Sequence, residues 1–431
     1  MEVSLLDILN AREARVQRQQ QLLAAHRAPL LCFTMNIAGP VKTTPLIQRG
    51  FEEGLTLLDQ QLPQETILFR ENQVLPTGCE AVFAIDLPAE EIKDICTELE
   101  ENHPLGRLFD MDVIGTDGRK LERKSQRGCI VCGAPGRFCA ASRAHSVEQL
   151  QSVTTQLLRQ YFFPLDIAAI AVQSLMDEVH TSPKPGLVDR RNNGSHRDMD
   201  LALFEASAQA LQPYFEACVR IGQNTAQMLP EETFPLLRAA GIEAEKTMLQ
   251  VTGGVNTHKG AIYTLGLLCG GIGRLCCTDT DAILAECQAM VGSSIEADFA
   301  SATGKTAGER LYLQHGIRGI RGEAADGFPA VKNIGLPHFR QALAEGFSQN
   351  DAGVLTLLHL IAQVQDTNLY HRGGYDGALW AANAVQQLLS QNPSNAMVAQ
   401  LDDAFIERNL SPGGCADLLA VTYFLYALNQ V

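Results

Sequence analysis

The spacing of apolar residues changes character near residue 150. Before that point, residues 4–25 and 90–103 carry apolar side chains at helical intervals. Two other apolar runs, PLLCFTMNIAGP at 29–40 and AVFAIDL at 81–87, are typical of strands that lead into turns. Strands mixed with helices predict an α+β domain for this part of the chain.

Beyond residue 150 apolar residues recur at helical spacing in long segments, and the alternation typical of strands nearly disappears. The segment 165–179 is one example, and Pro183 and Pro185 predict its end. Further helices are predicted at 198–222, 260–273, 279–291, 351–365, 376–390 and 415–429. The pattern therefore predicts an α+β N-terminal domain, residues 1–158, followed by an all-α C-terminal domain, residues 159–431.

Length and composition agree with a globular chain of more than one domain. The 431 residues exceed what one hydrophobic core usually organises, and 46% are hydrophobic and 19% charged. The formal net charge of −15 argues against binding to nucleic acid or to an anionic membrane, because both would repel the average surface. A phosphate-rich ligand must therefore meet a local basic patch.

We expect the chain in the cytoplasm, without a targeting or membrane segment. Acidic and basic residues are mixed from the start of the sequence, unlike in a signal peptide. The most apolar runs, AIYTLGLLCGGIG and LLAVTYFLYAL, are too short to span a bilayer. In a reducing compartment most of the twelve cysteines should be buried thiols.

An Asp-Met-Asp sequence occurs once in each predicted domain. Asp110 and Asp112 lie in GRLFDMDVIG, whose alternation predicts a strand with both carboxylates on one face, and Asp198 and Asp200 lie in HRDMD. Two carboxylates one residue apart can share a Mg²⁺ ion, which usually serves to hold phosphates. The alternative is that either pair caps a helix or faces water.

The loops between the C-terminal helices are rich in Gly, Asn, His and charged residues, as in PKPG, TGGVNTHKG, GIRGIRGEAADGFP and DTNLYHRGG. Two glycines followed by a lysine at a predicted helix start are suited to anion binding. Solvated connectors are the alternative. Together the loops predict a polyphosphate site with Mg²⁺ and with carboxylates for acid–base chemistry. The candidate residues are Lys184, Gly253, Gly254, Asn256, His258, Lys259, Arg321, Glu323, Asp366, Asn368 and Arg372.

The segment CIVCGAPGRFCAASRAH places Cys129, Cys132, Cys139 and His145 at spacings compatible with zinc. Only one CxxC is present and the intervals match no standard finger closely, so zinc is the less favoured interpretation and buried thiols the favoured one. The same region supplies the basic patch that an acidic protein needs. Its basic residues are Arg119, Lys120, Arg123, Lys124, Arg127, Arg137 and Arg143.

The longer motifs resemble two known enzyme families. In the C-terminal half PKPGLVD, HRDMD, TGGVNTHKGAIY, IRGEAADGFP and DTNLYHRGG resemble triphosphoribosyl-dephospho-CoA synthase of the citrate lyase system. In the N-terminal half REAR, TMNIAGPVK, HPLGRLFDMDVI, RGCIVCGAPGRFC and SRAH resemble apo-citrate lyase phosphoribosyl-dephospho-CoA transferase, although Ala38 stands where that family usually has a proline. The sequence resembles a fusion of the two enzymes.

The synthase resemblance implies that the C-terminal half joins ATP and 3′-dephospho-CoA, whose 2′-hydroxyl displaces adenine and leaves a ribose that keeps its triphosphate. Such a glycosyl transfer needs a base for the hydroxyl and an acid for adenine. The expected roles are Mg²⁺ binding or hydroxyl activation for Asp198 and Asp200; triphosphate binding for Lys184, Lys259 and Arg321; acid–base chemistry or ribose binding for His196, His258, Glu323 and Asp366; and further substrate contacts for Gly253, Gly254, Asn256, Asn368 and Arg372.

The transferase resemblance implies that a serine of the citrate lyase acyl carrier protein attacks the innermost phosphate of that product and releases pyrophosphate. Asp110 and Asp112 suit a Mg²⁺-assisted displacement. The residues expected to neutralise the pyrophosphate are Arg107, Arg127 and Lys42. A nucleotidyltransferase-like fold is expected by analogy, and the basic run 119–143 is expected to dock the acidic carrier.

One alternative belongs to a different class of function. In it, a zinc-stabilised carrier-protein adaptor is fused to a Mg²⁺-dependent hydrolase of nucleotide glycosides. Incubation with ATP and dephospho-CoA distinguishes the two interpretations, because transfer yields a joined product and hydrolysis yields free ribose triphosphate.

Overall fold

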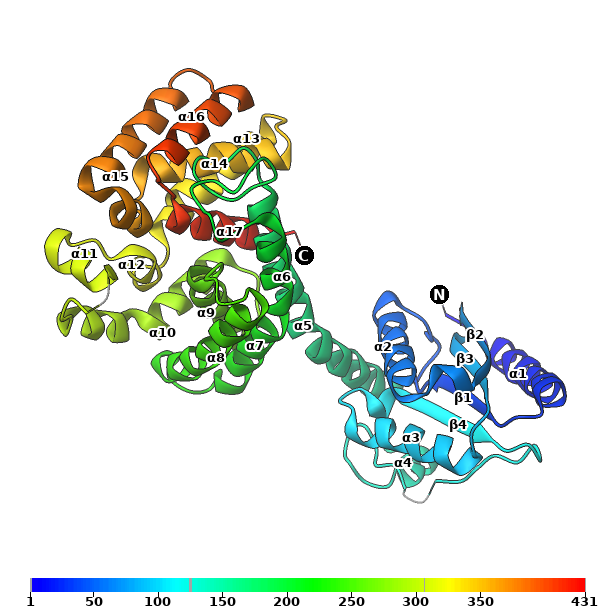
Figure 1. Cartoon of the computed structure of the whole chain (residues 1–431). Coiled ribbons are helices and arrows are strands. Elements are labelled where there is room, and N and C mark those ends of the chain that lie inside the picture. The colour runs from blue at the N-terminus through cyan, green and yellow to red at the C-terminus, as the bar shows by residue number, and fades with distance from the viewer. Residues whose placement is uncertain (1, 124–125, 306, 431) are drawn as a thin grey trace. The chain divides into compact units, whose positions relative to one another are not determined.

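The computed structural model describes residues 2–123, 126–305 and 307–430 and divides the chain into two compact units, Met1–Phe163 and Pro164–Val431. The boundary between the units falls within helix α5, Val147–His180, as does the predicted domain boundary after residue 158. The first unit combines a sheet with helices, whereas the described residues of the second unit form helices and no strand (Figure 1). The predicted sequence of an α+β part followed by a helical part is confirmed.

A four-stranded antiparallel sheet forms the centre of the first unit, in the order β2-β3-β1-β4. The strands are β1 Leu30–Met35, β2 Ile67–Leu75, β3 Gly78–Ile85 and β4 Phe109–Ile114. The apolar pattern predicted three of them but missed β2, whose residues are mostly exposed and include a polar run. The strand with the Asp-Met-Asp pair, β4, lies at one edge of the sheet.

Helices cover both faces of this sheet (Figure 1). On one face Leu22 of α1 packs with Cys32 and Val82, and on the other the ring of Phe51 in α2 stacks on Phe33 at 4.9 Å. Neighbouring residues of β1 therefore point to opposite helices. The helices and helical turns of this unit are α1 Leu5–His26, α2 Pro45–Gln61, η1 Gln64–Thr66, α3 Ala89–Asn102, η2 Gly106–Leu108 and α4 Gly136–Ser142.

The second unit continues with helices after α5. They are α6 Leu201–Ala210, α7 Gln212–Thr225, α8 Pro230–Val251, α9 Lys259–Leu275, α10 Thr280–Ala300, α11 Ala307–His315, α12 Gly319–Ala325, the π-helical turn η3 Val331–Gly335, α13 Leu336–Ala344, α14 Gln349–Gln363, α15 Thr367–Leu389, α16 Asn395–Glu407 and α17 Gly413–Leu428. The helix predicted at 198–222 is divided into α6 and α7, because Pro213 fits the first turn of a helix but not its interior. The α9 and α17 helices are the most deeply buried, which agrees with their apolar sequences.

Among the described residues, no single helix combines the length and apolarity needed to cross a bilayer. Helices α9 and α10 are long and apolar enough only when taken together, and the pair is bent by 109°.

Candidate active sites

A cavity of about 1290 Å³ lies beside β4 in the first unit. Its wall contains seven Lys or Arg and four Asp or Glu side chains, so it is a basic site in an acidic chain. These are Lys93, Arg107, Lys120, Arg123, Arg127, Arg137, Arg143, Glu100, Asp110, Asp112 and Glu122. Much of the predicted basic patch thus lines the cavity, although Lys124 lies outside the described residues.

The alternation of β4 directs the first Asp pair toward this cavity. Phe109, Met111 and Val113 are buried, and Asp110 and Asp112 alternate with them as partly exposed residues that line the cavity. The prediction that both carboxylates share one face is confirmed. Burial and then the charge of Asp112 raise the pKa of Asp110 above its ordinary value. Two acids held this close favour a cation between them.

Two basic side chains already reach these carboxylates. Lys120 Nζ lies 2.5 Å from Asp112 Oδ2, and Arg127 Nη1 lies 3.7 Å from Asp110 Oδ1. The Lys120 side chain is 59% exposed, so its ion pair is screened by solvent and contributes little stability. A substrate or a metal ion can therefore displace this lysine at low cost.

Glu100, which was not singled out from the sequence, organises the buried side of the cavity. It is 2% exposed, and its Oε1 accepts a hydrogen bond from Met111 N at 2.9 Å and lies 3.2 Å from Arg127 Nη2. Burial raises the pKa of Glu100, and Arg127 acts in the opposite direction. Arg127 also donates to the carbonyls of Gly106 and Phe109. It therefore links β4 to the segment that follows.

Arg107 and Lys42 both donate to backbone carbonyls. Arg107 Nη2 donates to Gly128 O, and Lys42 Nζ donates to Ile37 O at 2.5 Å. Burial lowers the pKa of both groups. Arg107 lines the cavity, but Lys42 does not, so the structure does not bring Lys42 to the Asp pair.

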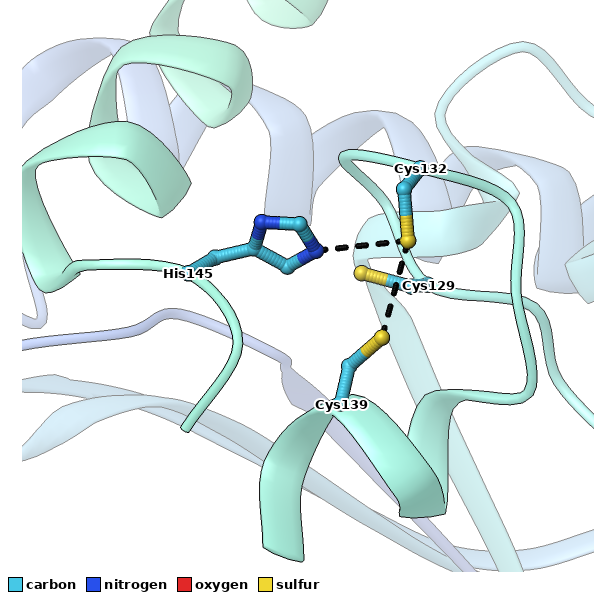
Figure 2. A group of neighbouring side chains, drawn as sticks. All are labelled: Cys129, Cys132, Cys139 and His145. Carbon is cyan, nitrogen blue, oxygen red and sulfur yellow. Dashed lines mark hydrogen bonds between the residues drawn. The ribbon is translucent and has the colours of Figure 1, made fainter. Parts of the chain in front are cut away.

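Cys129, Cys132, Cys139 and His145 form a compact group at the same cavity, here called the Cys₃His cluster. Their ligand atoms all lie within 4.8 Å of one another. The sulfurs of Cys132 and Cys139 are 3.5 Å apart, and His145 Nε2 lies 3.3 Å from Cys132 Sγ. Figure 2 shows the imidazole and the three sulfurs directed toward a common point. Spacing alone disfavoured zinc, but the fold assembles all four donors.

A buried ion pair lies at the end of α5 in the second unit. Lys184 is 1% exposed, and its Nζ lies 2.5 Å from Glu178 Oε1 and donates to Glu178 O at 2.8 Å. Burial raises the pKa of Glu178, and Lys184 opposes this rise. Burial and then the charge of Lys184 lower the pKa of His258 to about 3. The structure thus brings Lys184 near His258, together with a glutamate that sequence reasoning missed.

His258 is therefore a neutral buried imidazole at ordinary pH. Its Nδ1 forms a 2.8 Å hydrogen bond with Ser207 Oγ, which also accepts one from Thr257 Oγ1 at 2.8 Å. Its buried Nε2 has no hydrogen-bond partner among the described residues. Such a nitrogen is costly in an empty site and useful beside a polar ligand.

Asp366 and Glu323 line a cavity of about 600 Å³ in the second unit. Asp366 is 3% exposed, and it accepts hydrogen bonds from the backbone N–H groups of Asn368 at 2.7 Å, Leu369 at 3.2 Å and Cys415 at 2.7 Å. Burial raises the pKa of both Asp366 and Glu323. These two predicted residues are thus brought together at one cavity as acids that hold protons more tightly than usual.

Asp417 belongs to the same group of acids and was not predicted. Burial and then the charges of Glu178 and Asp366 raise the pKa of Asp417 well above its usual range. Its carboxylate packs on Gly260, where a Cβ would lie 1.9 Å from Asp417 Oδ2. A signal was present in the sequence, because Asp417 is the only charged residue in the apolar run of α17.

The HRDMD segment has a different environment. Asp198 and Asp200 are exposed, and Asp200 Oδ1 caps α6 by accepting a backbone hydrogen bond at 2.9 Å. His196 Nε2 lies 2.9 Å from Ser411 Oγ, and Arg372 Nη2 lies 3.2 Å from His196 Nδ1. Burial and then Arg372 lower the pKa of His196, and Asp198 opposes them. The structure groups His196, Asp198 and Arg372, but none of these lines the 600 Å³ cavity.

The TGGVNTHKG loop begins with two glycines in the left-handed region, Gly253 with φ 65° and Gly254 with φ 97°, and both face open space. Asn256 Oδ1 accepts a hydrogen bond from Lys259 N at 3.2 Å at the start of α9. Lys259 Nζ lies 2.8 Å from Glu245 Oε2 and its side chain is 60% exposed. The loop therefore presents exposed backbone and one cation to solvent.

Arg321 lines two cavities of the second unit. It lines one cavity of about 350 Å³ with Glu245, and a second of about 350 Å³ with Arg318 and Thr367. Arg318 and Thr367 also line the 600 Å³ cavity that holds Asp366. The three cavities therefore adjoin, with two arginines between them.

Each unit thus offers carboxylates beside cations at a substantial cavity, the arrangement expected where a group is transferred between phosphorylated substrates. The fold and sites define a chain with two group-transferring enzyme units. Comparison with known proteins agrees with this class. A model of the family apo-citrate lyase phosphoribosyl-dephospho-CoA transferase matches residues 3–161, and a model of the family ATP:dephospho-CoA triphosphoribosyl transferase matches residues 164–431.

Full-length relatives have the same two-part organisation. The chain is 37% identical to Protein CitXG of Haemophilus influenzae, over 98% of this chain and 96% of that protein. It is 32% identical to Protein CitXG of Leuconostoc mesenteroides subsp. cremoris, over 99% and 97% of the two chains. The 2-(5''-triphosphoribosyl)-3'-dephosphocoenzyme-A synthase of Pectobacterium atrosepticum is 43% identical over 64% of this chain and 93% of its own length. The chain belongs to the CitXG family, a fusion of two transferases, as its motifs indicated.

Proposed function

We propose that the second unit joins ATP to 3′-dephospho-CoA, and that the first unit transfers the resulting phosphoribosyl-dephospho-CoA group to the citrate lyase acyl carrier protein. One observation carries the proposal: two transferase units follow one another in a single chain, each with its own cavity lined by acids and bases. Because the first product is the second substrate, one chain performs both steps.

In the second unit, the 2′-hydroxyl of dephospho-CoA attacks the anomeric carbon of the ATP ribose as the bond to adenine breaks. A carboxylate takes the hydroxyl proton, and adenine leaves with the bonding electrons and gains a proton at a ring nitrogen. Asp366 and Glu323 are our candidates for these proton transfers, because both line the 600 Å³ cavity and burial raises the pKa of both carboxyl groups. The unpartnered Nε2 of His258 is assigned to a ribose hydroxyl.

The triphosphate is assigned to the space between the adjoining cavities. Arg321 lies there with Arg318, and Lys259 pairs with Glu245 of the neighbouring wall. Lys184 is almost fully buried. We therefore assign it an indirect role, in which its positive charge attracts the triphosphate from within the protein. The further substrate contacts remain as proposed from the motifs, namely Gly253, Gly254, Asn256, Asn368, Arg372 and His196.

In the first unit, the serine hydroxyl of the carrier protein attacks the innermost phosphate and pyrophosphate leaves in line with it. Arg107 and Arg127 are assigned to the charge that develops on the leaving group, since both line the cavity with the Asp pair. Lys42 is a weaker candidate because it lies outside this wall. A nucleotidyltransferase-like architecture is proposed on the analogy of two carboxylates on one strand.

Mg²⁺ fits the acidic pair of the first unit. Asp110 and Asp112 offer oxygen donors on one face, and burial and then the charge of Asp112 raise the pKa of Asp110. A bound Mg²⁺ would stabilise negative charge on the phosphates. In the second unit Asp198 and Asp200 are proposed for the same role, although one oxygen of Asp200 caps α6.

The carrier protein is proposed to dock on the basic run 119–143. Arg123, Arg137 and Arg143 line the cavity that holds the Asp pair, so an acidic partner bound there would present its serine to that site. Charge reversal at Arg137 and Arg143 should slow carrier modification at low salt and weaken its salt dependence, without changing adenine release. An unchanged rate of carrier modification would show that the carrier protein does not dock on this patch.

The proposal is tested by assaying the two half-reactions separately on the intact chain. Wild-type protein with ATP and dephospho-CoA should release adenine and form the joined product, whereas free ribose triphosphate would support a hydrolase. Changing both Asp198 and Asp200 to Asn should abolish adenine release but leave carrier modification intact when the triphosphoribosyl intermediate is supplied. Asn caps helices well, so α6 should stay folded. Loss of both activities in a folded variant contradicts two separate sites.

A further inference from the structure

The segment that carries the Cys₃His cluster has very little structure of its own to hold it together. Among the described residues between 116 and 146, the only regular element is the seven-residue helix α4, with two isolated bridges beside it. Of the described residues in this range, 116–123 and 126–146, Cys139 alone is buried. A segment without a hydrophobic core needs another source of order, and metal ligation is the usual one in small cysteine-containing segments.

The backbone around the cluster is shaped so that donors from three places converge. Gly133 has φ 72° and closes a turn in which its N–H donates to Cys129 O at 2.9 Å. That turn brings Cys132 back beside Cys129, and the N–H of Val131 donates to Cys129 Sγ at 3.4 Å. Cys139 comes from α4 and His145 from the residues after it (Figure 2).

The distances match one metal ion better than a set of unrelated thiols. In a tetrahedral zinc site with Zn–S bonds of about 2.3 Å, neighbouring sulfurs lie roughly 3.8 Å apart. The observed separations of 3.5 Å and 3.3 Å, and the 4.8 Å limit for the whole group, surround a space of that size. Three sulfurs with one imidazole nitrogen are donors that favour zinc over Mg²⁺.

We propose that the Cys₃His cluster binds one structural Zn²⁺ ion, and that this ion fixes part of the wall of the 1290 Å³ cavity that the Asp pair also lines. Four protein donors complete a tetrahedral shell and leave no open position, so the ion is structural and does not activate water. Binding converts the three thiols to thiolates and releases their protons to solvent.

The connection to the cavity is short. Arg127 and Gly128 directly precede the first ligand, and they are bound to β4 and η2 through Glu100 and Arg107. Cys129, Cys139 and His145 themselves line the cavity, as do Arg137 and Arg143 between them. Zinc would therefore hold these arginines in place relative to Asp110.

The direct test is the zinc content of the intact chain after purification in reductant and dialysis against a mild chelator. Wild-type protein should retain about one zinc per chain, and Cys132→Ser should retain less than about a fifth of that. His145→Cys, which keeps four donors, should retain zinc. Cys276→Ser changes an exposed cysteine of the second unit and serves as the matched control. Cobalt added to stripped protein should give the visible bands of tetrahedral thiolate coordination in wild type and not in Cys132→Ser.

The outcomes separate the zinc site from the proposed function. Wild-type protein without zinc, retention by Cys132→Ser, a coloured iron centre, or a disulfide between Cys132 and Cys139 in the reduced preparation would each overturn the site. The role of zinc at the cavity wall rests on the proposed function, and a separate activity measurement tests it. Stripped protein should modify the carrier at least about tenfold more slowly and recover with added zinc, while its adenine release is unchanged. An unchanged rate in zinc-free protein overturns that role but not the site.

Discussion

The buried pair of Lys184 and Glu178 gives the sharpest test of how the second unit is held together. Lys184 is 1% exposed and Glu178 is 6% exposed, so neither charge is solvated by bulk water. Each compensates the other through a 2.5 Å contact, and Lys184 also donates to the Glu178 carbonyl. Replacing Lys184 by Met keeps the length and apolar bulk of the side chain but leaves the glutamate buried without a partner.

The expected cost follows from that burial. Removing one partner of a buried ion pair usually destabilises a protein by about 3–5 kcal/mol, because the remaining charge is uncompensated. For a unit of this size, each kcal/mol lowers the unfolding midpoint by about 2–4 °C, so Lys184→Met should lower it by roughly 6–20 °C. Adding Glu178→Gln to that variant removes the stranded charge and should restore most of the loss.

The assay is differential scanning calorimetry of the intact chain at neutral pH, with attention to the transition of the second unit. Lys246→Met is a matched control, since Lys246 pairs with Glu243 at 2.7 Å but both side chains are more than half exposed. That change should cost less than about 1 kcal/mol. A Lys184→Met variant as stable as this control, or a double variant no more stable than Lys184→Met, would refute the reasoning.

Three further changes have expected outcomes. Asp110→Asn should reduce the rate of single-turnover carrier modification by orders of magnitude, because about 1.4 kcal/mol of lost transition-state stabilisation is tenfold in rate. The thermal midpoint should not fall, since burial and Asp112 both disfavour the charged carboxylate. Transfer at the wild-type rate would show that the Asp pair is not part of the active site. The pKa of His258 is about 3 in the folded chain and about 6.5 in the unfolded chain, so only the unfolded chain gains a proton between pH 6.5 and 5. The free energy of unfolding should therefore fall as pH is lowered below 6.5, by about 2 kcal/mol at pH 5. His258→Asn should therefore flatten the loss of stability between pH 6.5 and 5 in urea titrations, and an unchanged slope would contradict the assignment. Gly260→Ala should displace Asp417 and lower the rate of adenine release at least about tenfold. Gly308→Ala is the control and should have no effect, because its added methyl group meets no atom within 4 Å. Equal rates in both variants would exclude a role for the close packing at Gly260.

Sequence patterns predicted the parts of the fold that depend on burial along one element. The runs at β1 and β3 are apolar because both faces are covered, and the alternation at β4 reflects one buried and one exposed face. Several elements were not predicted, among them β2 and α2 in the first unit and α8, α13 and α16 in the second. The polar run of β2 reflects an exposed edge. The helical spacing of Ile47, Phe51 and Leu55 in α2 was present in the sequence but was not used. Edge position depends on pairing with distant strands, which local spacing does not encode.

The candidate sites were likewise predictable from the sequence only where they depend on one element. The placement of Asp110 and Asp112 follows from the period of a strand, so it was predictable. Which loops share a cavity depends on how helices pack, so the grouping of Asp366 with Glu323, and the separation of both from HRDMD, was not. Asp417 escaped notice because an acid in an apolar helix acquires meaning only from its partners. The grouping of the Cys₃His donors was not predictable from their intervals, which match no common motif, because a turn and a short helix bring the donors together.

One claim underlies the others, namely that one chain makes the prosthetic group precursor and transfers it. The direct measurement is the intact mass of the citrate lyase acyl carrier protein after incubation with this chain, ATP and dephospho-CoA, with adenine and pyrophosphate quantified in the same reaction. We expect a carrier that gains one phosphoribosyl-dephospho-CoA group, with one adenine and one pyrophosphate released for each carrier modified. Adenine accompanied by free ribose triphosphate and a carrier of unchanged mass would contradict that claim.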